Sequence, residues 1–113
     1  MIDWHIICFC ETRAKSDNRV LEGDHRLFTC QGPTRFTGIG ILVNKTLVPF
    51  IKKYHEISGR LCAIDMLIGK TRYRIISIYV PTTDYDIADL EELYAQLGDI
   101  IGDGRKNGMR III

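Results

Sequence analysis

Residues 60–80 read RLCAIDMLIGKTRYRIISIYV and carry the strongest secondary-structure signal in the chain. Two runs rich in Ile, Leu, Tyr and Arg, residues 60–68 and 71–80, lie on either side of the dipeptide Gly69–Lys70. β-Branched and aromatic residues favour strands, and a two-residue connection that contains glycine favours a tight turn. We therefore predict an antiparallel hairpin. Its second strand ends at Pro81, because proline has no N–H to donate to a neighbouring strand.

Three further apolar runs and the last residues of the chain also predict strands. The first run is short, continuous and bounded by polar residues, which is typical of a strand buried on both faces. The others are shorter or contain glycine, which suits a bulge or a close approach of two backbones. The predicted strands cover residues 4–10, 25–30, 38–44 and 109–113.

The segments between these runs lack a strand or helix pattern. Residues 12–24 are rich in Ser, Asp, Asn and Gly, and we interpret them as a loop. Residues 46–57 contain Pro49, which argues against a regular helix and a central strand. We predict an edge strand or an irregular connection there.

The hydrophobic period changes to that of a helix over residues 84–101, DYDIADLEELYAQLGDII. Its apolar residues recur every three or four positions and its acidic residues occupy the other positions. Thr83 or Asp84 can cap the start of this amphipathic helix, and we expect Gly102 and Gly104 to end it. One helix among several strands predicts a mostly-β chain of the α/β class, of the α+β type.

Length and composition limit the chain to one compact unit, residues 1–113, of which 46% are hydrophobic. No run reaches the roughly 18–20 apolar residues of a membrane span, and the N-terminus lacks the features of a secretory signal. We therefore expect an intracellular protein, nuclear or cytoplasmic, that is not secreted and has no membrane partner. The cysteines, among them the isolated Cys30 and Cys62, fit reduced thiols that behave as small hydrophobic residues.

The net charge of +1 conceals an uneven distribution. Residues 1–83 hold 12 Lys and Arg against 7 Asp and Glu, whereas residues 84–103 hold 7 acidic residues and no basic one. Arg105, Lys106 and Arg110 make the remaining tail basic. A mildly basic body beside an acidic helix is compatible with a polyanionic substrate but does not require one.

Several stretches, taken in order, resemble the endonuclease/exonuclease/phosphatase domains. They are IICFCETR (residues 6–13), GIGILVNK (38–45), the segment from Gly59 to Asp84, and MRIII (109–113). Non-LTR retrotransposon endonucleases and craniofacial-development-protein-like sequences look most similar. The resemblance covers nearly the whole chain, and its most specific parts are a strand that ends in Glu-Thr and a later strand that ends in Tyr-x-Pro-Thr.

This resemblance implies a hydrolase with two packed sheets flanked by helices, in four layers. Its activity would be that of a divalent-metal-dependent endonuclease or phosphodiesterase acting on nucleic acid, with DNA the favoured partner. The family's metal-binding glutamate corresponds to Glu11, with Mg²⁺ or Mn²⁺ as the cofactor. The family's tyrosine, which orients the scissile phosphate or supports the catalytic acidic groups, corresponds to Tyr79. Arg13 and Thr82 are weaker candidates for substrate contacts.

The candidate site residues also have simpler interpretations. On position alone, Glu11 is a solvated loop carboxylate, and only the ordered matches shift the preference to a metal ligand. Tyr79 is equally a strand aromatic that packs in a core. Arg13 can be a surface cation, and Thr82 can serve the turn before the helix. Asp65 lies in an apolar strand and would need a partner if buried, so an outward-facing position is the simpler account.

The chain also departs from the family pattern. The family has an Asn-bearing strand before this region, and after it a Gly-Asp-x-Asn turn and a Ser-Asp-His segment that act on water and phosphate. We find no match for these, so we expect a partial domain, truncated at both ends and inactive by itself. Two alternatives stay open: a non-catalytic remnant of a truncated retroelement, and a small α/β interaction module. The oligomeric state and the substrate among phosphodiesters are not determined by the sequence.

Overall fold

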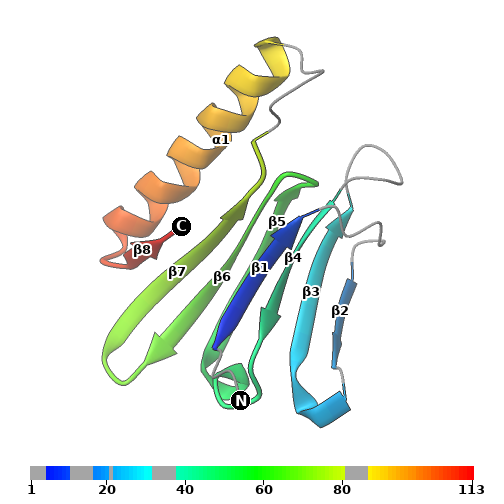
Figure 1. Cartoon of the computed structure of the whole chain (residues 1–113). Helices are drawn as coiled ribbons and strands as arrows, with labels where there is room; N and C mark the ends of the chain where they lie inside the picture. The colour runs from blue at the N-terminus through cyan, green and yellow to red at the C-terminus, as the bar shows by residue number, and fades with distance from the viewer. Residues whose placement is uncertain (1–4, 11–16, 21, 32–37, 81–86) are drawn as a thin grey trace.

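The computed structural model describes residues 5–10, 17–20, 22–31, 38–80 and 87–113, which form two four-stranded sheets and one long helix (Figure 1). This arrangement is mostly β and of the α+β type, as predicted. Sheet A contains, in spatial order, β1 (Ile6–Cys10), β4 (Gly38–Val43), β3 (Arg26–Gln31) and β2 (Asp17–Val20). Sheet B contains β5 (Ile51–Ser58), β6 (Leu61–Ile68), β7 (Thr71–Ile78) and β8 (Arg110–Ile112).

The predicted hairpin forms the centre of sheet B. β6 and β7 pair antiparallel without interruption from Leu61 opposite Ile78 to Ile68 opposite Thr71. Gly69 has a φ of +63°, which side chains with a Cβ rarely adopt, and this explains glycine in the two-residue turn. The turn fixes the register of both strands and therefore decides which side chains share a face.

The two faces of sheet B cover two separate cores, so that the molecule has three layers. Between the sheets, residues of β3 and β4 pack against one face of the hairpin; the buried members include Phe28, Ile39, Ile41, Val43, Cys62, Ile64, Met66 and Ile75. On the other face, the helix α1 (Ile87–Lys106) packs against alternate residues of the same strands; the buried members are Leu61, Ala63, Ile76, Leu93 and Ile100. This alternation follows from the two-residue period of a strand.

α1 connects β7 to β8, which pair in parallel. The helix continues four residues past Gly102, so the expected end at Gly102 and Gly104 is wrong. Gly108, with φ +73°, ends it instead: the Met109 N–H donates to the Gly104 carbonyl at 2.9 Å, and the Gly108 N–H donates to the Arg105 carbonyl at 3.1 Å. This pair of bonds is a Schellman cap. Among the described residues, no helix is both long and apolar enough to span a membrane.

Two edge strands correct the remaining strand predictions. β1 lies at the edge of sheet A, where Ile7 is 41% exposed and Cys8 is exposed as well; burial on both faces was therefore wrong. β2 forms within the predicted loop and pairs with β3 at the other edge. Its residues Asp17–Val20 lack the apolar alternation of a half-buried strand, so they carry no strand signal in the sequence. The strand forms through its backbone pairing with β3.

The connection after β4 agrees with its prediction. A short 3₁₀ helix, η2 (Val48–Phe50), contains Pro49 and leads directly into β5, an edge strand of sheet B. A second short 3₁₀ helix, η1 (Glu22–Asp24), precedes β3. Both lie at the end of the sandwich where β1 begins (Figure 1).

Candidate functional site

Tyr79, the one predicted site residue that the structure describes, directly follows β7. Its N–H donates to the Arg60 carbonyl at 2.9 Å, which extends the hairpin by one backbone bond. Its side chain is half-buried and packs against the core between the two sheets. Tyr79 therefore packs in a core, which is the simpler interpretation that the sequence had left open for this residue.

A groove of about 560 Å³ lies beside Tyr79, between the edges of the two sheets. Ile6 and Cys8 of β1 line one wall, and the C-terminal half of β7 lines the other. Ile39 also lines it, and Ile39 is the register partner of Cys10, the last residue of β1. The end of β1 and the end of β7 therefore lie at the same end of the sandwich (Figure 1).

The other predicted site residues, Glu11, Arg13 and Thr82, lie outside the described residues. The groove itself offers few polar groups, since Ser77 and Tyr79 carry the hydroxyls among its lining side chains. Within the described ranges, no three His, Cys, Asp or Glu side chains are close enough to hold a metal ion. The described residues that line the groove thus provide no carboxylate ligand.

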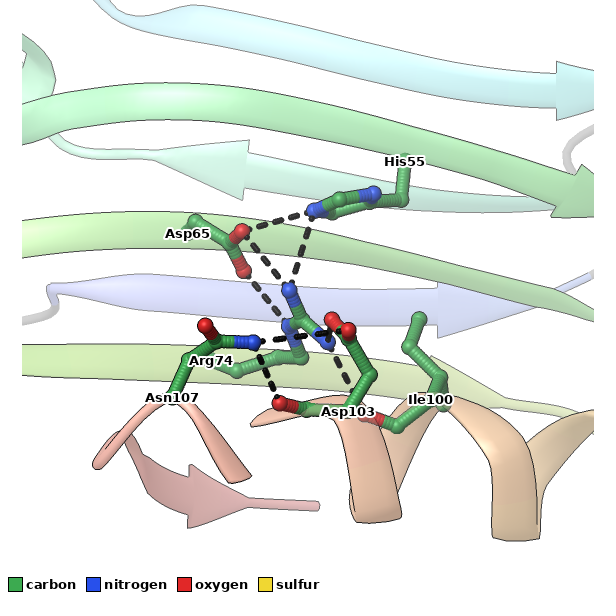
Figure 2. Close-up of polar contacts among 6 residues, drawn as sticks. All are labelled: His55, Asp65, Arg74, Ile100, Asp103 and Asn107. Atoms are coloured by element: carbon green, nitrogen blue, oxygen red, sulfur yellow. Dashed lines mark hydrogen bonds and ion pairs between the residues drawn. The ribbon is translucent and has the colours of Figure 1, made fainter. Parts of the chain in front are cut away.

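A second polar cluster lies on the opposite face of sheet B, beneath α1 (Figure 2). Arg74 of β7 is 3% exposed and donates to both carboxylate oxygens of Asp65: Nε to Oδ1 at 2.7 Å and Nη2 to Oδ2 at 2.9 Å. Nη1 donates to the Ile100 carbonyl at 2.9 Å and to Asp103 Oδ2 at 2.8 Å. The arginine therefore joins the hairpin directly to the backbone of α1.

His55 of β5 completes the cluster from the neighbouring strand. Its Nε2 lies 2.7 Å from Asp65 Oδ2, which also accepts from Arg74 (Figure 2). Hydrogen bonds donated to a carboxylate by cations or N–H groups stabilise its ionised form. Burial acts to raise the pKa of Asp65, but the bonds from Arg74 and His55 outweigh it and hold this pKa below 3.8. The hydrogen bonds that Arg74 donates to Asp65 likewise raise the pKa of Arg74.

The chemistry of this cluster is that of a structural clamp. The Arg74 guanidinium makes bonds through Nε and both terminal nitrogens, so it presents little donor capacity to a ligand. A buried bidentate pair has a defined geometry, which apolar packing alone lacks. We conclude that Arg74 and Asp65 fix the position of α1 on sheet B.

The interpretation of Asp65 as an outward-facing residue was wrong, although the sequence held the signal. A two-residue turn at Gly69–Lys70 places Asp65 directly opposite Arg74. Residues directly opposite in an antiparallel pair have neighbouring side chains, and opposite charges there attract. The partner that a buried Asp65 requires could thus have been found from the hairpin register.

The buried cysteines match their prediction as reduced, hydrophobic thiols. Cys30 and Cys62 are free and 1% and 0% exposed. The Cys30 thiol donates to the Ser58 carbonyl at 2.6 Å. Burial raises the pKa of each thiol to about 12, so neither forms a thiolate at neutral pH. They are unsuited to act as nucleophiles or metal ligands.

Comparisons with family models, with curated proteins and with solved structures find no match to this chain.

Proposed function

We propose that this chain carries part of a divalent-metal-dependent phosphodiesterase site, most closely like that of an endonuclease acting on nucleic acid. Glu11 binds the metal and Tyr79 contacts the phosphate. The observation that supports this assignment is that β1 and the C-terminal half of β7 line one groove, which also includes Ile39, the register partner of the last residue of β1. Glu11 follows β1 directly in the sequence, and Tyr79 lines the groove from β7.

The layer order is consistent with the proposal. Two sheets and one outer helix would supply three of the four layers that the resemblance implies. Both proposed residues follow strands that pack against the core between the sheets, so the scaffold beneath them is rigid. Catalytic groups held on rigid strands keep their positions better than groups on free loops.

The roles of the two residues follow from their chemistry. Mg²⁺ or Mn²⁺ takes one or two carboxylates together with water and substrate oxygens, and when bound it neutralises charge on the phosphate. Tyr79 can donate one directed hydrogen bond from its phenol to a phosphate oxygen. The apolar side chains of Ile39 and Ile75 line the groove and limit the access of water to it.

The described part of the groove provides no general base. His, Asp and Glu side chains are not among its lining residues, and its hydroxyls belong to Ser77 and Tyr79. General bases that deprotonate water near pH 7 are usually His or carboxylates. We therefore expect this chain to bind metal and phosphodiester weakly and to hydrolyse the bond slowly.

Metal binding tests the proposal directly. We expect Mn²⁺ binding, measured by the loss of the free-ion electron paramagnetic resonance signal, to weaken by about tenfold or more in Glu11→Gln. Tyr79→Phe should leave Mn²⁺ affinity unchanged, while weakening the binding of a phosphodiester such as bis(p-nitrophenyl) phosphate. Nicking of supercoiled plasmid should remain close to background in every variant.

Two results would contradict the proposal. Equal Mn²⁺ affinity in wild type and Glu11→Gln would remove the metal site, and the chain would then be better described as an interaction module. Rapid plasmid nicking that survives Glu11→Gln would show that hydrolysis uses other groups. A matched control is Glu56→Gln, which removes an exposed carboxylate that does not line the groove.

A further inference from the structure

Basic side chains gather at one end of sheet B. The chain reverses there between β6 and β7, β5 and β8 begin there, and α1 ends there (Figure 1). Each of these segments contributes exposed cations: Lys52, Lys53, Lys70, Arg72, Arg105 and Lys106. Arg110 at the start of β8 is exposed as well. We call this group the basic end.

The basic end contains a hollow that can accept an anion. The hollow has a volume of about 250 Å³, and Lys52, Lys53 and Arg72 line it together with Asn107. The Arg72 guanidinium donates to the Asn107 carbonyl, which holds it against the end of α1. The hollow is therefore bounded by cations from two strands and by the cap of the helix.

The charges around this hollow are not neutralised by neighbouring acids. No described carboxylate lies within ion-pair distance of Lys52, Lys53 or Arg72. Asp65, which also lines the hollow, is already paired with Arg74 at both oxygens. In the C-terminal half of α1, Asp103 is already paired with Arg74, and Asp99 lines a separate hollow. The other acidic residues of α1, such as Asp89 and Glu92, lie in its N-terminal half, away from the basic end. A net positive potential remains at the hollow.

We propose that the basic end binds the phosphate backbone of nucleic acid. Clustered Lys and Arg attract phosphates without reading sequence, and they release condensed counterions on binding. Membrane surfaces also attract cations, but stable attachment requires inserted apolar side chains as well. The apolar residues that line the hollow do not meet that requirement, since Met66 is 1% exposed and Leu67 and Met109 are half-buried.

This binding surface is separate from the proposed catalytic groove. Lys53 is near the beginning of β5 and Arg72 near the beginning of β7, whereas Tyr79 follows the end of β7. The two sites therefore lie at opposite ends of sheet B. Nucleic acid held at the basic end does not depend on Glu11, Tyr79 or a metal, so the proposal stands even where the catalytic one fails.

Fluorescence anisotropy with a labelled 20-base-pair DNA duplex in EDTA tests the proposal. We expect binding in the micromolar range or weaker at about 50 mM salt, with log K falling against log salt at a slope of about −3. The double substitution Lys52→Gln and Lys53→Gln should reduce this slope by about 2 and lower affinity by about tenfold or more. Both lysines are exposed, so the fold should be retained, as thermal unfolding can verify.

A cation at the other end of sheet B provides the matched control. Arg60 lies in the turn between β5 and β6, and Arg60→Gln removes one positive charge there. We expect its DNA affinity to stay within about twofold of wild type. The proposal is overturned if the double lysine variant binds DNA as tightly as wild type, or if Arg60→Gln loses as much affinity. It is also overturned if vesicles with about 30% phosphatidylserine bind more tightly than the duplex.

Discussion

The two faces of sheet B bury similar strands by different means. Toward sheet A, β6 presents Cys62, Ile64 and Met66, which pack in a predominantly apolar core. Toward α1, the same strand presents Leu61 and Ala63 and then Asp65, a charged group that is 9% exposed. One strand thus supports an apolar core on one side and a mixed core with an ionic centre on the other.

The two cores serve different purposes: one holds two layers together, and the other fixes the position of a helix on the sheet. Apolar contact is non-directional and scales with the area removed from water, so it holds two layers together without fixing their register. A bidentate ion pair with a further bond to a helix carbonyl has one geometry. We therefore assign most of the stability of the fold to the inter-sheet core, and the placement of α1 to the Arg74 cluster.

The largest effect should come from the inter-sheet core. Phe28 is 2% exposed and its ring centroid lies 4.6 Å from that of Tyr54. Phe28→Ala removes this contact and leaves a cavity, at a cost of about 3–5 kcal/mol of unfolding free energy in urea titrations. Phe50→Ala, at a 37% exposed position, should cost less than about 1 kcal/mol. Equal losses would contradict the dominance of this core.

The ionic cluster should produce the next largest effect. Asp65→Asn removes the charge that neutralises buried Arg74 and should cost about 3 kcal/mol. Because Arg74 anchors α1, amide hydrogen exchange should rise first in α1 and β8, before β5–β7. Asp103→Asn, with a side chain that is 61% exposed, should cost less than about 1 kcal/mol. A uniform rise in exchange across both sheets would disprove the positional role.

Acid should weaken the same clamp without a substitution. The pKa of Asp65 is lowered by folding, so its contribution is complete above the unfolded value of 3.8 and is lost as pH falls below that value. The difference in unfolding free energy between wild type and Asp65→Asn should therefore shrink between about pH 5 and pH 2. A difference that stays constant over this interval would show that folding does not lower the pKa of Asp65.

The smallest effect tests how closely α1 approaches the sheet. Gly98 and Gly102 have no atom within 4 Å of an added Cβ, so Gly98→Ala should stabilise by about 0.5–1 kcal/mol through helix propensity. At Gly104, a Cβ would lie 2.7 Å from Cδ1 of Ile111 and 3.4 Å from Cδ of Arg74. Gly104→Ala should therefore lose that gain. Equal melting temperatures for both variants would contradict the close contact.

Much of the fold could be predicted because its signals are local. Gly69 and the two apolar runs define the hairpin, and the period of residues 84–101 defines the helix. The failures have a different origin. β2 pairs at an edge through its backbone, and the helix passes Gly102 and Gly104 because Gly108 and the packing of Gly104 on Ile111 decide where it ends. These depend on contacts between distant residues.

The candidate sites follow the same division. Tyr79 was singled out by a motif and lines a groove, but the residues that line this groove come from four strands, β1, β4, β7 and β8, which no single stretch reveals. The Arg74 cluster draws on β5, β6, β7 and α1, and only its Asp65–Arg74 pair is implied by the hairpin turn. The basic end is similar, because its cations are scattered between Lys52 and Arg110 and converge only when the strands pair.

The parallel pairing of β8 with β7 has a consequence for the order of folding. The β6–β7 hairpin closes across two residues, whereas β8 must wait for the chain to cross sheet B through α1. Closing a longer loop costs more conformational entropy. The contacts of the parallel strand offset this cost only after the connecting helix has docked on the sheet. The Arg74 cluster joins the hairpin to α1. We therefore expect β8 to pair with β7 only after this cluster has formed.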